Sequence, residues 1–423
     1  MGDNLNYDRG MGPEKNWIIE ETRFDPEHTG KCEAIFAQGN GYLGLRNSLE
    51  EDYVKTKRDI VGVNVHTGEP MYCHTGLIEL HITSDIIYAL WNYYVTTKDQ
   101  DFMDRCGYEM ILETARFWNS RLEWIPEHDR YEIRDVIGPD EYKEHVDNNA
   151  YTNYMAAYNM DLAVKCIDEL KTEKPEIYKR LSGLTDLEAL KSQILEKRKL
   201  LYLPKPDEKT GIIPQFDGYF DLRQIDLAKY KAAPVVGTLF LDYSTEEIQH
   251  CQAGKQADVV ELIYQMEDIV SEELKEKNYY YYEARTLHDS SLSRAIHSVI
   301  ASDIGLKADA YDMFVKAGAT DLGQEMSSSD AGIHSANMGG IWQDVVMGFG
   351  GVRIGGDHLR IRPSLPEAWQ KLCFPLCWRG SRMKVSIYPD RMEIFNEGPP
   401  VEVEIGRKMA VVASGENTFV KVG

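Results

Sequence analysis

The chain has few cysteines, and none of them forms a recognisable pair. The seven are scattered, odd in number and without a Cys-x-x-Cys motif: Cys32, Cys73, Cys106, Cys166, Cys251, Cys373 and Cys377. If Cys373 and Cys377 lie on one extended strand, roughly 13 Å separates them, which is too far for a disulfide bond. The pattern therefore predicts reduced thiols, as expected of a cytoplasmic protein.

The chain also lacks an excess of basic residues and a long apolar run. Its formal net charge is -22, which argues against binding to nucleic acids or anionic membranes, because both require basic patches. The first residues, Met1 to Arg9, have neither an apolar run nor a basic start. We therefore expect no signal peptide, no transmembrane segment and a cytoplasmic location. Any small anion that binds must be held by a few local donors.

What is present is the composition of an ordinary globular enzyme, with 43% hydrophobic and 27% charged residues. From Ile78 onwards, apolar residues recur at helical spacing. They are Ile78, Ile82, Ile86, Leu90 and Tyr93, then Ile111, Ala115, Trp118 and Leu122. We expect further helices at about 150–170, 185–200, 255–270, 287–304, 307–318 and 333–349. Trp91 and Trp118 lie on helix faces and are expected in the core.

Helical hairpins with motifs on their connecting loops are typical of an α/α barrel, since the ring buries its apolar stripes and the loop ends form a pocket. From about Asp357 onwards, apolar residues alternate instead. The alternating residues are Met383, Val385 and Ile387, then Val401, Val403 and Ile405. This pattern predicts a small C-terminal β-domain.

A glycine-rich segment near the N-terminus fits the dinucleotide pattern G-x-G-x-x-G, from Gly39 to Gly44. No apolar helix face follows it, as a nucleotide-binding βαβ unit would require. We therefore expect no nucleotide site there.

An acidic turn followed by an amide-rich helix start occupies residues 136–154, Val-Ile-Gly-Pro-Asp-Glu-Tyr-Lys-Glu-His-Val-Asp-Asn-Asn-Ala-Tyr-Thr-Asn-Tyr. Gly138-Pro139 interrupts the chain, so Asp140 and Glu141 are expected on a loop. The Asp-Asn-Asn at 147–149 offers side-chain oxygens to cap a helix from about 150 to 170. By itself, such a turn is more often a surface loop and a helix cap than a catalytic site.

Two later segments place hydroxyls and imidazoles near expected helix starts. They are residues 282–293, Tyr-Glu-Ala-Arg-Thr-Leu-His-Asp-Ser-Ser-Leu-Ser, and residues 332–340, Gly-Ile-His-Ser-Ala-Asn-Met-Gly-Gly. With the backbone N–H groups of a helix start, such side chains give a phosphate the charge-assisted hydrogen bonds that it needs. Taken alone, either segment is more often a helix cap.

These three segments, in this order, closely resemble glycoside hydrolase family 65, the inverting disaccharide phosphorylases and related hydrolases. The resemblance implies that Glu141, the Glu of Gly-Pro-Asp-Glu, is the general acid. It assigns phosphate binding to Ser290, Ser291, His334 and Ser335. It assigns substrate binding to Lys255, Gln256 and His288, although Lys255 and Gln256 without it would be interpreted as a solvated helix turn.

The resemblance also implies a domain organisation. Residues 1–56 are expected to be the remnant of an N-terminal β-sandwich, residues 57–356 a partial α/α barrel that carries the catalytic loops, and residues 357–423 a C-terminal β-domain. The fold class is mainly α, an (α/α)6-type barrel that we expect to be incomplete, because fewer helices are found than a closed ring of six hairpins needs. The open side should expose apolar helix faces or be covered by another segment or subunit.

The chain departs from the family at the sugar site. Relatives hold the sugar on the cleaved side with a Trp-Asp segment that is absent here, and Gly62 stands where relatives carry a second Trp. Both departures weaken the expected substrate site and leave the acid and phosphate segments intact. We therefore expect feeble or absent turnover from the isolated chain.

Cleavage of an α-glucoside needs a proton for the departing oxygen and a nucleophile on the opposite face of the anomeric carbon. One acid suffices if phosphate attacks, so the resemblance implies inverting phosphorolysis to β-glucose 1-phosphate and an acceptor. The expected ligands are an α-linked glucoside and inorganic phosphate as co-substrate, with no other cofactor. No metal is expected, since the histidines lack i, i+4 ligand spacing. A homodimer stays open.

Two alternatives also stay open. A hydrolase of the same family would need a second carboxylate to activate water, with the two carboxyls about 6.5–9.5 Å apart, and no such base is obvious in the sequence. The second alternative is a truncated, non-catalytic relative that binds phosphate or sugar, which the missing Trp-Asp segment motivates. Titration with phosphate and with glucose would distinguish this truncated relative from an enzyme, because a fragment with an intact anion segment should bind only the phosphate.

Overall fold

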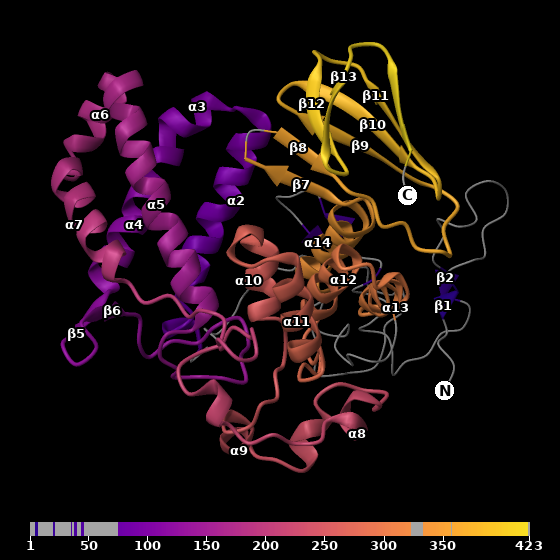
Figure 1. Cartoon of the computed structure of the whole chain (residues 1–423), viewed down its shortest axis with the longest axis horizontal. Helices are drawn as coiled ribbons and strands as arrows, with labels where there is room; N and C mark the ends of the chain where they lie inside the picture. Colours follow the sequence, from indigo (N-terminus) through magenta and orange to yellow (C-terminus); the bar gives the residue numbers. More distant parts are fainter. Residues whose placement is uncertain are drawn as a thin grey trace.

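The computed structural model describes residues 75–322, 333–356 and 358–421, together with residues 5–6, 20–21, 35, 38–39 and 44–45 near the N-terminus. Within these residues, a helical part and a C-terminal β-domain lie side by side (Figure 1). The protein is therefore mainly helical with a small β-domain, as the sequence predicted.

The helical part begins at α2 and ends just after α14. Its helices are α2 (Ile82–Thr97), α3 (Gln100–Phe102), α4 (Tyr108–Arg121), α5 (Ala150–Glu173), α6 (Pro175–Ser182), α7 (Leu187–Leu200), α8 (Ala228–Lys231), α9 (Thr245–Gln249), α10 (Val259–Gln265), α11 (Glu272–Glu283), α12 (Ser293–Asp303), α13 (Lys307–Gly318) and α14 (Ser335–Gln343). Wider helical turns follow α3 and α14, namely η4 (Met103–Gly107) and η8 (Asp344–Phe349). Every predicted helix has a counterpart, whereas α6, α11 and the short helices α3, α8 and α9 were not predicted.

The helix α11 lacks the spaced apolar stripe that marks most helices. Its apolar residues are Leu274 in a charged first half and then four consecutive tyrosines, of which Tyr279 and Tyr282 are buried. The Ser271 side chain caps the helix by accepting a hydrogen bond from the backbone N–H of Leu274. The Tyr282 hydroxyl donates to the Ile213 carbonyl oxygen. A serine cap and tertiary packing thus make this helix.

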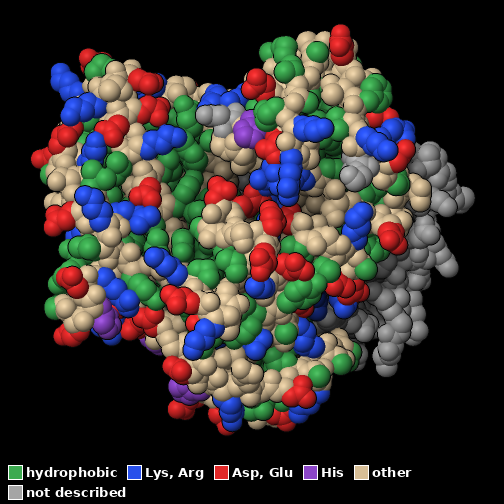
Figure 2. Space-filling view, in the orientation of Figure 1, with side chains coloured by type: hydrophobic (Ala, Val, Ile, Leu, Met, Phe, Trp, Pro, Cys, Tyr) green, Lys and Arg blue, Asp and Glu red, His purple; other side chains and the backbone are tan. Residues whose placement is uncertain are grey.

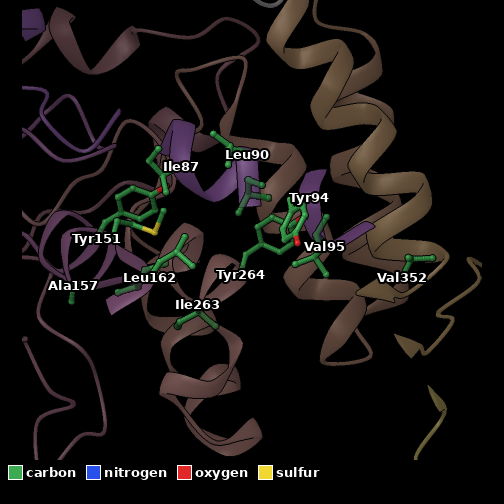
Figure 3. Close-up of a cluster of buried hydrophobic side chains, with 14 of the residues drawn as sticks. Ile87, Leu90, Tyr94, Val95, Tyr151, Ala157, Leu162, Ile263, Tyr264 and Val352 are labelled. Carbon is green, nitrogen blue, oxygen red and sulfur yellow. The ribbon is translucent and has the colours of Figure 1, made fainter. Parts of the chain in front are cut away.

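The core is built around α5, which packs against α2, α4, α7 and α10. Buried alanines of α5, among them Ala156 and Ala163, let these helices approach closely. Figure 3 shows side chains of α2, α5 and α10, including Ile87, Tyr151 and Ile263, directed toward one another. Each fully buried aliphatic side chain of this kind stabilises the fold by about 1.5–3 kcal/mol.

The C-terminal domain consists of two four-stranded sheets. One contains β9 (Leu372–Trp378), β10 (Ser381–Ile387), β11 (Arg391–Asn396) and β14 (Asn417–Lys421), in the order β14-β11-β10-β9. The other contains β7 (Val352–Gly355), β8 (His358–Ile361), β12 (Val401–Ile405) and β13 (Lys408–Val412), in the order β13-β12-β8-β7. β12 pairs with β8 in parallel. The predicted alternation is confirmed, because Met383 and Val385 are buried while Lys384 between them is exposed.

Arginines join the β-domain to the helices. At the β9–β10 turn, the backbone N–H of Arg379 donates to the Thr96 carbonyl oxygen at 2.7 Å and its guanidinium donates to the Val95 carbonyl oxygen at 3.1 Å. These bonds satisfy carbonyls at the C-terminal end of α2. Buried Arg353 on β7 lies 3.2 Å from a Glu267 carboxylate oxygen. Although burial acts to raise the pKa of Glu267, Arg353 and other cations hold it below its usual value.

A groove of about 760 Å³ lies between α2, α10, η8 and β7. Figure 2 shows hydrophobic side chains in the recess between the helical part and the β-domain. Beside it, α2 exposes Ile82, Ile86 and Tyr93 and α14 exposes Met338 and Trp342, all 43–54% exposed. These apolar faces agree with the expectation of a ring with an open side.

The two tryptophans that were expected in the core differ. Trp118 is fully buried, which confirms its prediction. Trp91 packs against the core but also lines the groove, so the prediction of a plain core residue was only partly right. Its ring is covered on one side by the Lys165 ammonium, 5.0 Å from the ring centroid.

The described N-terminal residues form short strand pairs. β1 (Leu5–Asn6) pairs with β2 (Glu20–Glu21), and β3 (Gln38–Gly39) pairs antiparallel with β4 (Gly44–Leu45), so that Gly39 lies opposite Gly44. This pairing differs from the strand-turn-helix of a dinucleotide site. The predicted departure at Gly62 lies outside the described residues. Among the described helices, none is long and apolar enough to cross a membrane.

Replacement of Gly351 by alanine should destabilise the junction of the two parts. Gly351 has a φ of 64°, and an added Cβ would lie 1.8 Å from the Arg362 carbonyl oxygen. Left-handed strain and the steric conflict together should lower the free energy of unfolding by about 2–4 kcal/mol. Gly406→Ala is the matched control, because Gly406 has a φ of 63° and open space around it. Equal losses in urea denaturation of the two variants would contradict a role for close packing.

Candidate active site

The acid segment forms a closed loop. Two backbone hydrogen bonds between Val136 and Val146, at 3.0 and 2.8 Å, close residues 137–145 into a loop. Shortly after this loop, Asn149 is the N-cap of α5, and its side-chain oxygen accepts a hydrogen bond from the Thr152 N–H at 2.9 Å. The predicted loop and the predicted helix cap are both confirmed.

Two buried carboxylates hold this loop from inside. Asp140 accepts hydrogen bonds from the Lys255 backbone N–H at 2.7 Å and from the Gln215 side-chain amide at 3.2 Å. Asp258 accepts from the Asp140 backbone N–H at 3.4 Å and from the Asn149 side-chain amide at 3.0 Å. Burial raises the pKa of Asp258 to about 7, and the nearby Asp140 carboxylate adds to the rise. A network of buried polar groups therefore fixes the shape of an otherwise irregular loop.

Glu141 projects from the loop and is partly exposed. Its Oε2 lies 2.7 Å from the Lys255 Nζ, and its Oε1 accepts a hydrogen bond from the Gln256 side-chain amide at 3.4 Å. The Gln256 amide also donates to the Pro139 carbonyl oxygen. The structure thus brings together the predicted acid and two of the predicted substrate-binding residues, while their roles stay predictions.

The Lys255 segment lies between the acid loop and the first predicted phosphate segment. Backbone hydrogen bonds pair Gly254 with residues 285 and 287, at 2.8 and 2.9 Å, and the Asp289 N–H donates to the Lys255 carbonyl oxygen at 3.0 Å. Lys255 is therefore held by hydrogen bonds to both of its neighbouring segments.

One side-chain hydrogen bond joins the acid loop directly to the first phosphate segment. The Tyr142 hydroxyl donates to the Asp289 Oδ2 at 2.6 Å. Tyr142 follows Glu141 in the chain, and Asp289 precedes Ser290. The predicted acid and the predicted phosphate ligand are therefore each one residue away from this bond.

Ser290 and Ser291 lie ahead of α12 and are partly buried. The Ser290 hydroxyl accepts a hydrogen bond from the Leu292 N–H at 3.3 Å. Leu292, the N-cap of α12, provides no side-chain cap. The first-turn N–H groups of α12 are thus oriented as in helix starts that bind anions.

The His288 imidazole is buried, and protein groups meet both of its nitrogens. Its Nδ1 lies 2.8 Å from the Ser293 hydroxyl and its Nε2 lies 3.2 Å from a Glu283 carboxylate oxygen. Burial lowers the pKa of His288 to about 4, so the ring is neutral near pH 7. Its predicted role in substrate binding stays a prediction and would require one of these two bonds to break.

Glu283 gathers His288, His297 and Lys231 around one carboxylate. It lies 2.6 Å from the His297 Nδ1 and 3.1 Å from the Lys231 Nζ. Burial acts to raise the pKa of Glu283, but hydrogen bonds from the two imidazoles hold it well below its usual range. The spacing of 2.6 Å is that of a hydrogen bond, shorter than the roughly 3.3 Å between ligands in a tetrahedral zinc site. We therefore interpret these residues as a hydrogen-bonded anchor for the 288–292 segment.

His334 and Ser335 stand at the start of α14. Asp321 accepts hydrogen bonds from the His334 backbone N–H at 3.0 Å and pairs with its Nδ1 at 2.7 Å, while Ser335 is exposed. An added Cβ on Gly340 would lie 2.8 Å from the Ala295 Cβ, so α14 crosses α12 at close range. The two predicted phosphate segments therefore begin neighbouring helices.

The sequence analysis missed a group of ionisable residues beside the acid loop. The Ile137 N–H donates to the Ile78 carbonyl oxygen at 3.1 Å, which brings Glu79 next to this loop. Burial raises the pKa of Glu79, the neighbouring His81 opposes this effect, and Glu141 adds to it. The His81 Nδ1 lies 2.8 Å from the Asp85 Oδ2. Only helical spacing marked this stretch in the sequence, so no pattern could reveal the cluster.

Comparisons with known proteins cover each part of the chain. Residues 53–343 match the glycosyl hydrolase family 65 central catalytic domain, residues 352–412 match its C-terminal domain and residues 19–66 match its N-terminal domain. The chain belongs to glycosyl hydrolase family 65. The resemblance on which the sequence analysis relied is confirmed.

Several relatives of this family 65 chain are phosphorylases. The kojibiose phosphorylase of Halothermothrix orenii is 45% identical over 361 residues, which cover 85% of this chain and 46% of the relative. The α,α-trehalose phosphorylase of Thermoanaerobacter brockii is 37% identical over 82% of this chain and 45% of the relative. A solved structure from the human microbiome, provisionally named a kojibiose phosphorylase, matches with a TM-score of 0.73 at 28% identity, over 81% of this chain and 49% of that chain. The chain spans about half the length of the curated relatives it matches.

Replacement of Tyr142 by phenylalanine should loosen the connection between the two loops. It removes the hydroxyl that donates to Asp289 and leaves the ring in place, so the free energy of unfolding should fall by about 1.5–3 kcal/mol. Affinity for phosphate, measured by calorimetry, should fall as well. Tyr178→Phe is the control, because it removes a hydroxyl that donates to Glu188 at 2.6 Å on the distant helix α6. Unchanged stability and phosphate affinity in Tyr142→Phe would show that the bond contributes nothing.

Proposed function

We propose that this family 65 protein catalyses inverting phosphorolysis of an α-linked glucoside, which yields β-glucose 1-phosphate and a free acceptor. The observation that carries the proposal is the Lys255 segment, which lies hydrogen-bonded between the loop of Glu141 and the segment of Ser290 and Ser291. This arrangement brings a carboxylic acid and a helix-start anion site to one region, as a reaction between a glucoside and phosphate requires.

In the proposed reaction, Glu141 protonates the oxygen of the departing acceptor. A phosphate held by Ser290, Ser291, His334 and Ser335 attacks the anomeric carbon from the opposite face, so the bond to the acceptor breaks as the bond to phosphate forms. The proton of hydrogen phosphate then replaces the one that Glu141 gave up. No second carboxylate and no cofactor other than phosphate is needed.

The ion pair between Lys255 and Glu141 gives substrate binding a role in this mechanism. The Lys255 ammonium lies 2.7 Å from the Glu141 carboxylate, the group that must deliver a proton to the leaving oxygen. A sugar hydroxyl that binds the Lys255 ammonium would break this ion pair and free Glu141 to face the leaving oxygen. We infer that Lys255 changes partner when the glucoside binds.

The substrate class rests on the relatives. Those named above are kojibiose and α,α-trehalose phosphorylases, so we propose a glucosyl disaccharide with an α linkage as the substrate. We further propose a cytoplasmic protein that binds neither nucleic acid nor membrane, which the free exposed thiols of Cys373 and Cys377 and the net charge of -22 support. The exposed apolar residues of α2 and α14 are compatible with the interface of a homodimer.

Hydrolysis is the second candidate, and the position of Glu79 favours keeping it. A hydrolase needs a carboxylate base besides the acid, and Glu79 directly follows Ile78, whose carbonyl oxygen accepts a hydrogen bond from the Ile137 N–H of the acid loop. Glu79→Gln should abolish glucose release in phosphate-free buffer if water is the nucleophile. If phosphate is the nucleophile, phosphate-dependent cleavage should outlast this substitution.

Replacement of Glu141 by glutamine should lower the cleavage of ordinary disaccharides by about 10²–10⁴-fold, because the side chain keeps its size but loses its transferable proton. A substrate with a good leaving group, such as α-glucosyl fluoride, should be partly spared. Glu144→Gln, three residues further along the same loop, is the matched control. Undiminished disaccharide cleavage by Glu141→Gln would refute the assignment of the acid.

Cleavage should also rise with phosphate concentration and saturate, and the first product should be the β-anomer of glucose 1-phosphate, as followed by NMR. His334→Ala with Ser335→Ala should weaken the phosphate response more than the binding of sugar, because both residues stand at the start of α14. His128→Ala, on an exposed turn away from the site, is the control. Glucose release at full rate without phosphate would instead support hydrolysis.

A further inference from the structure

Asp258 stands where an aspartate ordinarily caps a helix, yet it does not act as a cap. It is the N-cap residue of α10, and its side chain makes no capping hydrogen bond. An Asp at this position usually stabilises its helix through such a bond. The side chain therefore forgoes a favourable local interaction and points elsewhere.

Its carboxylate is used by the acid loop instead. Asp258 Oδ2 accepts hydrogen bonds from the Asp140 backbone N–H at 3.4 Å, the Asn149 side-chain amide at 3.0 Å and the Gln215 side-chain amide at 3.4 Å. Gly138 makes room for it, since an added Cβ there would lie 2.5 Å from the same oxygen. Three donors, two from the acid segment and one from Gln215, thus converge on one buried oxygen.

The connection continues from Asp258 to Glu141. Asp258 holds the backbone of Asp140, and the Asp140 carboxylate in turn accepts from the Lys255 backbone N–H at 2.7 Å. Glu141 is the next residue after Asp140, and its carboxylate meets the Lys255 ammonium. One chain of hydrogen bonds therefore fixes the predicted acid and its ion-pair partner together.

We propose that Asp258 is a positioning residue for Glu141, a buried carboxyl that fixes the acid loop against the Lys255 segment. The proposal depends on the function proposed above only because that function makes Glu141 the general acid. The hydrogen bonds themselves and the protonation of Asp258 are independent of it.

Geometry favours the neutral form of Asp258. Its carboxylate and that of Asp140 both approach the Gln215 amide, at 3.4 and 3.2 Å, so two negative charges would be neighbours in a buried place. The enclosed space lined by both carboxylates and Gln215 has a volume of only about 10 Å³, so there is little room for solvation. Two negative charges this close together in a buried place cost free energy, and one proton bound to either carboxylate removes their repulsion.

The surrounding groups decide which carboxyl keeps the proton. Asp140 accepts two backbone N–H bonds, from Lys255 and Tyr142, and the Lys143 ammonium acts against the burial that raises its pKa. Asp258 faces Asp140 from the acid loop. Burial and the Asp140 carboxylate raise its pKa to about 7, against the hydrogen bonds from Asn149 and the Asp140 backbone and the nearby His81 ahead of α2. The hydroxyls of Tyr219 and Tyr282 also lie in its field. Asp258 is therefore the member of the pair that holds a proton as the pH approaches 7.

The proton on Asp258 has a consequence for stability. Its pKa is raised from 3.8 to about 7 on folding, so the folded state binds a proton that the unfolded state has released between these pH values. Stability must then fall as the pH rises from about 4 to about 7. Asp258→Asn removes this dependence, because an amide does not titrate.

The test follows the carboxyl of Glu141 by NMR in the full chain with ¹³C-labelled glutamate side chains, and the signal is assigned by its loss in Glu141→Gln. Asp258→Ala should move the pH at which Glu141 is half-protonated by about one unit or more, a tenfold change in proton affinity. Asp258→Asn should move it less, because the amide oxygen still accepts from the three donors. Glu261→Gln is the matched control, since Glu261 lies in the same helix, has a pKa raised by burial to about 7 and bonds to Gln265.

Two results would overturn the proposal. One is a Glu141 titration in folded Asp258→Ala that is identical to that of the parent chain. If Asp258→Ala does not fold, melting temperatures of Asp258→Asn decide, and a difference from the parent that stays constant from pH 4 to pH 8 would be the second. Failure of the protein to cleave any glucoside would count against the proposed function alone, since neither measurement uses turnover.

Discussion

A buried carboxylate has to be met by hydrogen-bond donors, and the Asp140 carboxylate meets this requirement with donors from two other segments of the chain. The Lys255 backbone and the Gln215 side chain both donate to it, and neither segment could move without leaving a buried charge unsatisfied. Because Glu141 and Lys255 are next to these contacts, the geometry of the site follows from the solvation of its neighbour. The positions of Glu141 and Lys255 therefore follow from the hydrogen bonds that the buried Asp140 carboxylate requires.

The anion side of the site follows a different rule. A chain with a net charge of -22 repels anions at long range, so any phosphate must be attracted by short-range donors. In the proposed function, the helix starts of α12 and α14 provide such donors. Glu283 and Asp321 hold the two segments through His288 and His334, so acidic residues serve here as anchors for the imidazoles.

Patterns that are local in the sequence predicted the structure well. Gly138-Pro139, the Asn149 cap and the alternation of β10 each depend on a few neighbouring residues, and each has the expected form. Asp258 was missed because an aspartate at a helix start is ordinarily a cap, and the three donors that redirect it lie 118, 109 and 43 positions away. Glu79 was missed for the same reason, since only the fold brings it to the acid loop. The helix α11 was not predicted because four consecutive tyrosines do not show the spacing of apolar residues that marks a helix.

The two hydrogen bonds between Arg379 and the end of α2 set an order of events during protein synthesis. Thr96 and Val95 receive their hydrogen bonds from a residue 283 and 284 positions further along the chain. A ribosome that adds residues at about 5–20 per second needs at least about 14 seconds to reach Arg379 after it has made α2. During that interval, the carbonyl oxygens of Val95 and Thr96 have water as their partner, and α2 gains its contact with the β-domain only after the β9–β10 turn has been made.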